Sequence, residues 1–325
     1  MRYLVTGGAG FIGSHLTERL LAAGHDVTVL DDFSTGSRAN LAAVRRHPHL
    51  KVMACDVARS SKIVRREVAA ADRVVHLAAA VGVELVVKSP VETIRTNIRG
   101  TENVLEPAAE FGKRVLIAST SEVYGKSTRE SFSETDDLLI GCPTRSRWCY
   151  ACSKLLDEFY LTAFHRSCGL PGTVVRFFNT VGPRQTGRYG MVVPRFVERA
   201  LRNEPLPVYG TGEQSRCFCH VDDVVRAVLL LLEEPASYGN IYNIGSTRRI
   251  AIGELAKLVI ERTGSASTIE HIPYDRAYAK GFEDMMRRKP DTSAIRALTG
   301  WRPEKSLEAI IEAALSSLIN SSRRV

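Results

Sequence analysis

Tyr150 and Lys154 are spaced i, i+4, which places both side chains on one face of a helix. A lysine charge beside a phenol lowers the pKa of the phenol, so we expect Tyr150 to act as a base near neutral pH. Lys154 could also hold the ribose of a bound cofactor. Tyrosine and lysine often occur at this spacing, so the interpretation depends on the elements around the pair.

Hydroxyl groups precede this pair. The segment 114–118 is apolar and β-branched, which predicts a strand, and Ser119, Thr120 and Ser121 follow it directly. In a doubly wound parallel sheet, the carboxyl ends of the strands border the ligand-binding crevice. We therefore expect these hydroxyl groups to lie in the same crevice as Tyr150.

A glycine-rich turn near the start of the chain predicts a phosphate-binding site. It lies between a short apolar strand at 3–5 and a helical pattern that begins at Ser14. The turn fits G-x-G-x-x-G from Gly8 and G-x-x-G-x-x-G from Gly7, and both patterns end at Gly13. Such a turn lets the backbone approach a pyrophosphate, whose charge rests on unpaired N–H groups at the helix start. The alternative is a turn that merely joins strand and helix.

Asp31 indicates which ligand this turn binds. It ends the next apolar strand, 27–30, where its carboxylate can accept hydrogen bonds from an adenosine ribose. Asp31 and Asp32 together would repel a 2′-phosphate, and no arginine follows them directly. The sequence therefore predicts NAD rather than NADP.

Apolar, β-branched segments recur along the first half of the chain, with helix-length segments between most of them. This alternation predicts parallel β-α-β units and an α/β fold with a doubly wound parallel sheet, a Rossmann domain. The expected strands are 3–5, 27–30, 51–54, 73–77, 114–118 and 173–177.

After Phe178, prolines and glycines divide the sequence into short pieces, which indicates a second, smaller region. The chain then returns to the sheet, because 221–232 reads as an apolar helix and 241–244 as a short strand. Amphipathic helices are expected at 252–263 and 306–319. The predicted domains are an NAD-binding Rossmann domain at 1–178 and 217–246, and a smaller α/β substrate-binding domain at 179–216 and 247–325.

The composition limits the class of protein. Hydrophobic residues make up 44% and charged residues 25%, as in an ordinary soluble globular protein, and the longest apolar run, 228–232, is far too short to span a bilayer. The first strand is expected at residue 3, which leaves no room for a secretion signal, so we expect a cytoplasmic protein without a membrane partner. The net charge is +8, but the basic residues are scattered, which favours a small anionic substrate over a nucleic acid.

Seven cysteines, an odd number, argue against a disulfide framework and suit a reducing compartment. Cys149 and Cys152 form C-x-x-C, and Cys217 and Cys219 form C-x-C, spacings that also occur at zinc sites. No histidine-rich motif accompanies either pair, and the first pair flanks Tyr150 at the start of the expected helix. We therefore expect no metal site.

Together the motifs resemble the extended short-chain dehydrogenase/reductases, in the NAD-dependent group of nucleotide-sugar epimerases, dehydratases and decarboxylases, along nearly the whole chain. Within that group the sequence is most similar to the UDP-glucuronic acid decarboxylases, which include UDP-xylose synthases and the bacterial decarboxylase domain of the aminoarabinose pathway. The matching segments are TGGAGFIGSH at 6–15, DD at 31–32, CDV at 55–57, HLAA at 76–79, NIRGT at 97–101, STSEVYG at 119–125, SRWCYACSK at 146–154, RFFNTVGPR at 176–184 and RRKPD at 287–291.

The resemblance implies an enzyme that decarboxylates UDP-glucuronic acid with NAD as a recycled oxidant. Thr120 would hydrogen-bond the sugar C4 hydroxyl, Tyr150 would remove its proton, and Lys154 would tune Tyr150. Loss of a hydride from C4 gives a 4-ketone β to the C6 carboxylate, which makes loss of carbon dioxide easy. The products would be UDP-xylose, the released UDP-4-keto-pentose, or both.

Glu122 matches the catalytic acid of these decarboxylases, and Arg288 matches their proposed proton donor. Arg288 could also grip the substrate carboxylate through paired hydrogen bonds, and the high pKa of a guanidinium favours this electrostatic role. Each residue has a simpler interpretation: Glu122 as a solvated loop carboxylate, and Arg288 as part of an exposed basic run at 287–289. A nucleotide-sugar 4-epimerase, which needs neither residue, is the alternative function.

The resemblance also assigns binding residues, with Asn179 on the diphosphate and Arg216 on a phosphate. The NAD-binding residues would be Gly7, Gly10, Phe11, Ile12, Gly13, Asp31, Asp32, Asp56, Val57, Leu77, Tyr150 and Lys154. The substrate-binding residues would be Val81, Thr120, Ser121, Arg147, Asn179, Arg184, Arg195, Val208, Tyr209, Gln214, Arg216 and Arg288. Where the bacterial relative has a substrate-binding tyrosine, this chain has Phe282, and Tyr278 is the candidate replacement.

Helices expected around 93–111 and 150–166 carry apolar side chains on more than one face. In relatives such helices pair across a two-fold axis, so the resemblance implies a homodimer formed through a helix bundle. In a monomer, the same side chains would belong to a thicker core. A protein that has kept the cofactor but lost turnover is a further alternative, and the intact set of Thr120, Tyr150 and Lys154 argues against it.

Overall fold

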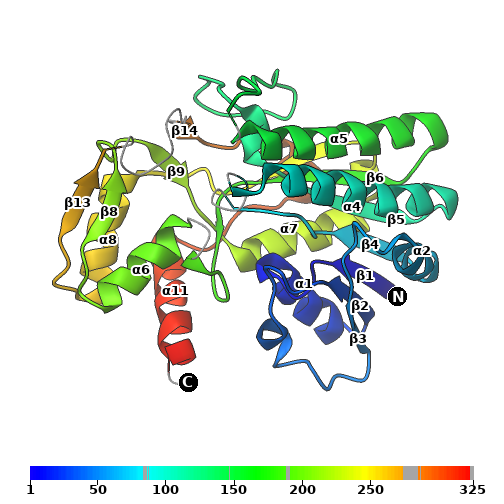
Figure 1. Cartoon of the computed structure of the whole chain (residues 1–325), viewed down its shortest axis with the longest axis horizontal. Coiled ribbons are helices and arrows are strands. Elements are labelled where there is room, and N and C mark those ends of the chain that lie inside the picture. Colours follow the sequence, from blue (N-terminus) through cyan, green and yellow to red (C-terminus); the bar gives the residue numbers. More distant parts are fainter. Residues whose placement is uncertain are drawn as a thin grey trace.

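The computed structural model describes residues 1–82, 86, 88–145, 147–187, 191–273, 285 and 287–322 of the chain. Within these residues seven parallel strands form one sheet in the order β11-β6-β5-β4-β1-β2-β3 (Figure 1). The strands are β1 (Arg2–Thr6), β2 (Asp26–Asp31), β3 (Leu50–Ala54), β4 (Arg73–His76), β5 (Arg114–Thr120), β6 (Gly172–Phe177) and β11 (Ile241–Ile244).

The central strands are buried on both sides of the sheet, which explains their continuous apolar sequences. Every residue of β4 is buried, and in β1 Arg2 alone is exposed. Val5 of β1 lies between Val29 of β2 and Val75 of β4 in the register. Because β-branched residues favour extended backbone, the side chains that exclude water also favour the strand conformation.

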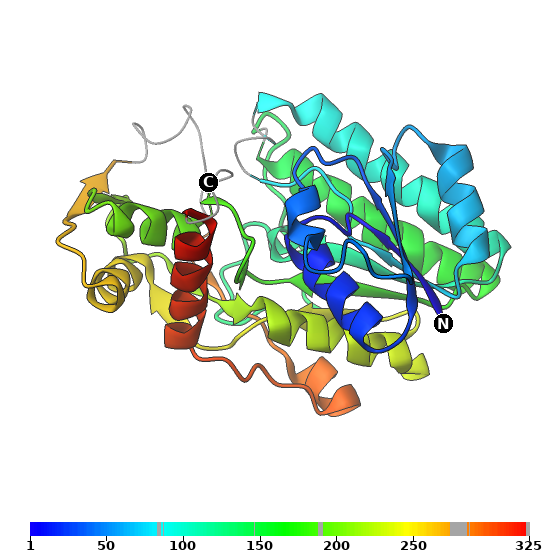
Figure 2. The same ribbon diagram turned by 90° about the horizontal axis from the view of Figure 1, so that it is seen from below.

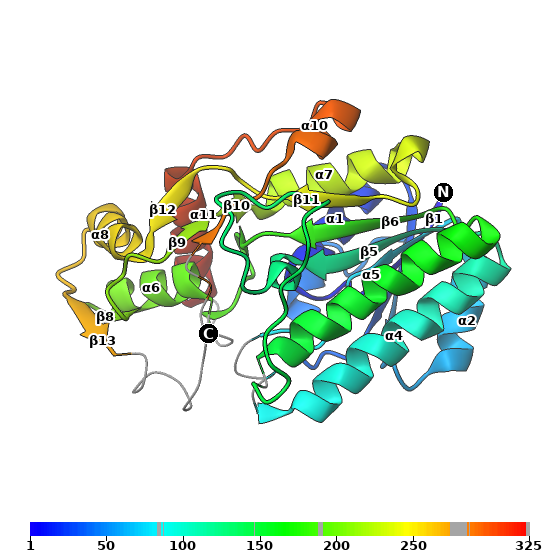
Figure 3. The same cartoon turned by 90° about the horizontal axis from the view of Figure 1, so that it is seen from above.

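Helices cover both faces of the sheet, as a doubly wound fold requires (Figure 3). One face packs against α1 (Phe11–Ala22) and α7 (Val221–Glu233), whose leucines and valines join one apolar core. The other face packs against α2 (Ser61–Ala70), α4 (Pro90–Glu110) and α5 (Trp148–Cys168), which share a second core. The predicted fold class is confirmed.

A smaller part of the chain, at the left of Figures 1 and 2, has its own apolar core, in which Phe196, Leu255 and Ile310 are fully buried. Its helices are α6 (Val192–Leu201), α8 (Ile252–Thr263) and α11 (Leu307–Ser322). Its paired strands are β8 (Leu206–Tyr209) with β13 (Ile269–Ile272), β9 (Ser215–Cys217) with β12 (Arg249–Ala251) and β14 (Arg287–Arg288), and β7 (Thr180–Val181) with β10 (Cys219–His220). The domain boundaries drawn from the sequence stay a prediction.

Some elements differ from their expected bounds. Strand β5 continues past 118 to Thr120, because Thr120 still pairs with Phe177 of β6. Thr120 therefore ends a strand and does not belong to a loop. The remaining short helices are η1 (Arg38–Leu41), η2 (Ser121–Tyr124), η4 (Pro235–Ser237) and α10 (Ser293–Thr299). None of the helices described combines the length and apolar character needed to cross a bilayer.

A buried ion pair fastens α5 to the sheet. Arg176 of β6 donates hydrogen bonds to both oxygens of Glu158 on α5, at 3.0 and 2.7 Å, and both side chains are 3% exposed. Ser119 of β5 donates to the same carboxylate. A buried charge is costly unless a partner and hydrogen bonds satisfy it, and here both carboxylate oxygens accept. The position of α5 over β5 and β6 is thereby fixed.

Glu158→Ala is expected to lower the free energy of unfolding by about 3–5 kcal/mol, because Arg176 would keep a buried charge without its partner. Urea denaturation measures this difference. Glu254→Ala is the matched control, since Glu254 pairs with Lys257 at 2.9 Å while these side chains are 62% and 67% exposed. Loss of that surface pair should cost less than about 1 kcal/mol, and equal losses in the two variants would contradict the role of burial.

The glycine turn before α1 leaves no room for a side chain at Gly13. A Cβ atom there would collide with the Gly7 carbonyl oxygen and lie 2.8 Å from the Gly8 Cα. Gly13→Ala is expected to lower the free energy of unfolding by about 1–3 kcal/mol and to weaken NAD binding, measured by thermal unfolding and binding titration. Gly253→Ala is the control in the first turn of α8, where the nearest atom, on Gly212, is 3.6 Å away. It should be neutral or stabilising by up to about 1 kcal/mol.

Candidate active site

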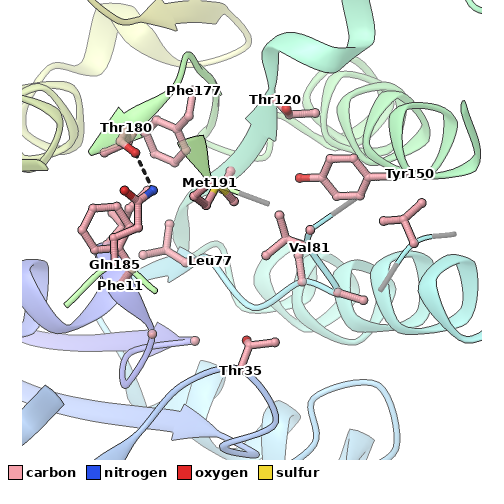
Figure 4. A pocket seen from close by; sticks show the side chains of 18 of the residues that line it. Phe11, Thr35, Leu77, Val81, Thr120, Tyr150, Phe177, Thr180, Gln185 and Met191 are labelled. Carbon is pink, nitrogen blue, oxygen red and sulfur yellow. Dashed lines mark hydrogen bonds between the residues drawn. The ribbon is translucent and has the colours of Figure 1, made fainter. Parts of the chain in front are cut away.

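A cleft of about 890 Å³ opens at the carboxyl ends of the sheet strands, between the sheet and the smaller part (Figure 4). Its walls come from residues that end or follow β1, β2, β4, β5 and β6, and from α5, β8, β9 and β14. This is the edge at which open parallel sheets bind ligands. Every candidate site residue from the sequence lines this cleft, except Val208.

Val208 lies in β8, and its side chain is fully buried in the apolar core of the smaller part. It can therefore contact a ligand only through its backbone, whereas its neighbours Pro207 and Tyr209 line the cleft. Tyr278 and Phe282 lie outside the described residues.

The glycine turn and the start of α1 form one end of the cleft. Gly7 has a φ of +69°, which favours glycine, and a Cβ atom there would lie 2.8 Å from the Ala78 nitrogen. Among the described residues, no side chain caps the start of α1 at Gly10. The first N–H groups of the helix are thus available to an anion, and the close-packed turn fits the diphosphate of a dinucleotide.

Asp31 ends β2 beside this turn. Its carboxylate accepts hydrogen bonds from the backbone N–H groups of Ala9 and Phe33, each at 2.8 Å. Burial raises the pKa of Asp31, these donors oppose the shift, and the charge of Asp32 adds to it. The carboxylate lines the cleft and can accept further hydrogen bonds from a ribose, while a 2′-phosphate would meet two acidic groups. The site fits NAD.

Tyr150 and Thr120 reach the same cavity from α5 and β5 (Figure 4). Desolvation raises the pKa of the Tyr150 phenol, Glu122 raises it further, and hydrogen bonding to Thr120 opposes the increase. The expectation that the pKa is lowered is therefore wrong for this arrangement. Desolvation raises the pKa more than nearby cations lower it. Lys154 forms its ion pair with a different group.

That group is Asp157, one turn further along α5. The Lys154 Nζ lies 2.5 Å from the Asp157 Oδ2, and the two side chains are 3% and 2% exposed. Sequence reasoning missed Asp157, although its i, i+3 spacing from Lys154 places both residues on one helix face.

Thr120 also shapes the chain that follows it. Its hydroxyl oxygen accepts a hydrogen bond from the Glu122 backbone N–H at 3.2 Å and so caps η2. The short helix ends at Tyr124, and Gly125 follows it with a φ of +60°, which favours glycine. This turn places Ser121 and Glu122 at the cleft wall.

Three arginines act on Glu122. Arg288 and Arg147 both form ion pairs with its carboxylate, Arg147 at 3.2 Å, and Arg216 acts on it through its charge. Desolvation alone would raise the pKa of Glu122, but the arginines lower it to about 2. The side chains of Glu122 and Arg288 are 15% and 11% exposed, so neither is a solvated surface charge.

Strand pairing brings Arg288 to this site from far along the chain. Strand β14 lies beside β9, with Arg288 opposite Arg216 in the register. The Nε of Arg288 is buried and has no hydrogen-bond partner among the described residues. Arg287, by contrast, is half exposed and lies 3.6 Å from Glu130. Of these two arginines, only Arg288 lines the cleft.

Arg184 and Arg195 line the cleft while protein groups engage them. Arg184 donates to both oxygens of Glu18, at 2.7 and 2.8 Å, and to the Ser14 hydroxyl at 3.2 Å. Arg195 donates to the Tyr209 hydroxyl at 2.9 Å and stacks over its ring. An anion that binds to Arg184 would have to share this guanidinium with the Glu18 carboxylate.

Amide side chains hold the backbone at the end of the cleft where the resemblance places the nucleotide. Asn179 donates to the Cys217 carbonyl oxygen at 3.0 Å, and Gln214 donates to the Tyr209 carbonyl oxygen at 2.8 Å. These bonds join the segment after β6 to β9, and the segment before β9 to β8.

Other lining residues were not predicted. Phe177, Met191 and Gln185 lie across the cavity from Tyr150, and Gln185 donates to the Thr180 carbonyl oxygen at 2.8 Å (Figure 4). Their residue types resemble ordinary core or turn residues, so no pattern in the sequence distinguished them.

All seven cysteines are free thiols. Within the described part of the chain, no group of His, Cys, Asp and Glu side chains is arranged to hold a metal ion. Burial raises the pKa of both Cys149 and Cys152 beside Tyr150.

Residues 3–245 match the model of the NAD dependent epimerase/dehydratase family. The chain is 41% identical to UDP-N-acetyl-alpha-D-glucosaminuronate decarboxylase of Bacillus cytotoxicus, over 94% of each chain. It is 37% identical to UDP-glucuronic acid decarboxylase 1 of Xenopus tropicalis, over 94% of this chain and 69% of that protein.

Among solved structures, the dTDP-glucose 4,6-dehydratase DesIV from Streptomyces venezuelae, with NAD and TYD bound, has a TM-score of 0.88 to this chain. The match is 31% identical and covers 99% of this chain and 98% of that one. NAD, which the glycine turn and Asp31 fit, is the cofactor. The chain belongs to the NAD dependent epimerase/dehydratase family.

Proposed function

We propose that this protein decarboxylates UDP-glucuronic acid with NAD as a recycled oxidant. The charge around Glu122 carries the proposal: Arg288 and Arg147 both form ion pairs with this one carboxylate, an excess of one positive charge close to Tyr150, while Arg216 is the expected partner of a phosphate. A nucleotide-linked neutral hexose carries negative charge only on its diphosphate and would leave this excess unbalanced, whereas a uronic acid brings a carboxylate to it. The names of two relatives, at 41% and 37% identity, also describe uronic acid decarboxylases.

Oxidation of the sugar requires a base at its C4 hydroxyl. Thr120 would hold this hydroxyl and Tyr150 would take its proton, since both reach the same cavity. Arg288 favours the tyrosinate through its charge. Lys154 lies one turn beyond Tyr150, where it would contact the cofactor ribose.

Bound NAD supplies the acceptor for the hydride that leaves C4. The sugar then carries a ketone β to its carboxylate, so the electrons of the C5–C6 bond enter an enolate as carbon dioxide leaves. A proton is added at C5. UDP-xylose would form if the ketone is reduced before release, and the UDP-4-keto-pentose would form if it is released first.

Arg288 and Arg147 would hold the substrate carboxylate before it leaves. The buried Nε–H of Arg288 has no acceptor among the described residues, so it could donate to this carboxylate. A guanidinium can bind a carboxylate through two hydrogen bonds. Glu122 is ionised at neutral pH, since its pKa is about 2. It can deliver a proton only after taking one up, which becomes easier when a second carboxylate competes for the same arginines.

The second candidate substrate differs at the sugar C2 position. The relative with 41% identity is named for UDP-N-acetyl-glucosaminuronate, which makes UDP-N-acetylglucosaminuronic acid that candidate. Both sugars present the same carboxylate to the arginines. A 4-epimerase would use Thr120, Tyr150 and Lys154 but would give the arginines around Glu122 no carboxylate to bind.

The proposal extends to the whole molecule. We propose a homodimer formed through α4 and α5, because Val91, Ile94, Leu156 and Phe159 on these helices expose apolar side chains. We also propose a cytoplasmic location and the two domains drawn from the sequence.

The purified chain, given NAD and UDP-glucuronic acid labelled at C6, is expected to release labelled carbon dioxide. Arg288→Ala should lower kcat/KM by about 100-fold or more while NAD stays bound, because the substrate carboxylate loses its donor. Arg287→Ala is the matched control, since Arg287 is half exposed and outside the cleft, and it should keep full activity.

Three other results would change the assignment. An epimer formed without gas would identify a 4-epimerase. Carbon dioxide from UDP-N-acetylglucosaminuronic acid alone would select the second candidate. Full turnover by Tyr150→Phe would remove Tyr150 as the base, and full activity of Arg288→Ala would contradict the role of the arginine cluster.

Glu122 also makes stability depend on pH. Its pKa in the folded protein is about 2, below the ordinary 4.5, so the ionised group stabilises the fold above about pH 4.5 and loses this contribution as the pH falls toward 2. Urea denaturation at about pH 6 and about pH 3 should show a larger loss for the wild type than for Glu122→Gln. Parallel losses in both proteins would show that the ion pairs do not form.

A further inference from the structure

Asp157 is a buried acidic group that the proposed reaction does not use. Its Oδ2 lies 2.5 Å from the Lys154 Nζ, and neither side chain is more than 3% exposed. Opposite charges at this distance and burial interact far more strongly than at the surface. Lys154 is therefore held in one position, and a negative charge compensates its own.

Hydrogen bonds from the neighbouring helix also fix this pair. Thr101 of α4 hydrogen-bonds to the Asp157 carboxylate and lies 3.2 Å from the His76 Nε2. The His76 Nδ1 is 2.7 Å from the Thr6 hydroxyl oxygen at the end of β1. Burial, with Lys154 adding to the effect, lowers the pKa of His76 to about 3, so this imidazole is neutral. His76 therefore brings no charge to the pair near neutral pH.

Among the described residues, the charges that act most strongly on Tyr150 lie on three elements. Glu122 on η2 and Asp157 on α5 oppose the tyrosinate, and Arg288 on β14 favours it. The next acidic residue on α5, Glu158, is paired with Arg176 of β6 at 2.7 Å, so its charge is compensated. Asp157 is thus the acidic group on the helix of Tyr150 that acts on the phenol.

We propose that Asp157 is a positioning residue that restrains Lys154 and sets the pH range in which Tyr150 serves as a base. The inference rests on the proposed function, in which Tyr150 accepts the proton of the sugar hydroxyl. Asp157 holds the ammonium from the next turn of the helix, on the side away from the turn of Tyr150, and adds a negative charge near the phenol. Both effects make the tyrosinate less stable than it would be beside a lysine that has no acidic partner.

Asp157→Asn removes this charge and keeps the size of the side chain. The acid limb of the pH profile of kcat/KM should then move to lower pH by about one unit, because Lys154 would act on the phenol uncompensated. Asp157→Glu keeps the charge and should keep the wild-type limb. Glu67→Gln removes a buried carboxylate on α2, outside the cleft, and should lower stability without moving the limb.

Ultraviolet titration of the NAD-loaded protein gives a second readout that needs no substrate. The tyrosinate absorbance that disappears in Tyr150→Phe reports this phenol alone, and in Asp157→Asn it should develop at lower pH than in the wild type. If Asp157→Asn does not fold, Asp157→Ser, which leaves space for a water beside Lys154, carries the same expectation.

The outcomes separate this inference from the proposed function. A shifted titration in a protein that releases no carbon dioxide would overturn the proposed function and support the role of Asp157. Decarboxylation with an unchanged pH limb and an unchanged titration in Asp157→Asn would overturn the role of Asp157. A limb that moves equally in Glu67→Gln would also overturn it, because the effect would then follow from general loss of structure.

Discussion

The structure depends on the buried carboxylate of Glu158. It holds α5 against the sheet by accepting hydrogen bonds from Ser119 of β5 and Arg176 of β6. Tyr150 lies on the same helix, and Thr120 follows Ser119 at the end of the same strand. One carboxylate therefore fixes the distance between the two hydroxyl groups that meet in the cleft. These hydrogen bonds add to the apolar packing of α5, because a buried charge cannot leave its donors without a large cost.

Around this fixed frame, the buried charges fall into two groups. On α5 the charges cancel in pairs, Lys154 with Asp157 and Arg176 with Glu158. That region therefore has little net charge to attract an anion. At the end of the cleft near Glu122 they do not cancel, because several arginines act on one carboxylate. A site that is balanced at one end and cationic at the other orients a substrate by its charge.

Local sequence patterns carried enough information to predict the sheet, the glycine turn and the helix that bears Tyr150 and Lys154. Each of these depends on periodicity or spacing within about twenty residues. The contact of Arg288 with Glu122 could not be predicted in this way, because it depends on the pairing of β14 with β9, two strands too short to show alternation. Asp157 had a readable i, i+3 spacing from Lys154, but only burial makes its charge important, and burial is a property of the folded chain.

The pKa of Tyr150 shows why residue types alone do not determine acid–base chemistry. The lysine charge favours tyrosinate, but desolvation disfavours any charge, and Glu122 and Asp157 disfavour a negative one. A bound uronic acid would add another carboxylate to this end of the cleft. In the proposed reaction the arginines would therefore have two electrostatic tasks that compete, since they would hold the substrate carboxylate and also offset its effect on the base. An excess of guanidinium groups over carboxylates meets both demands, whereas a single arginine paired with Glu122 would meet neither.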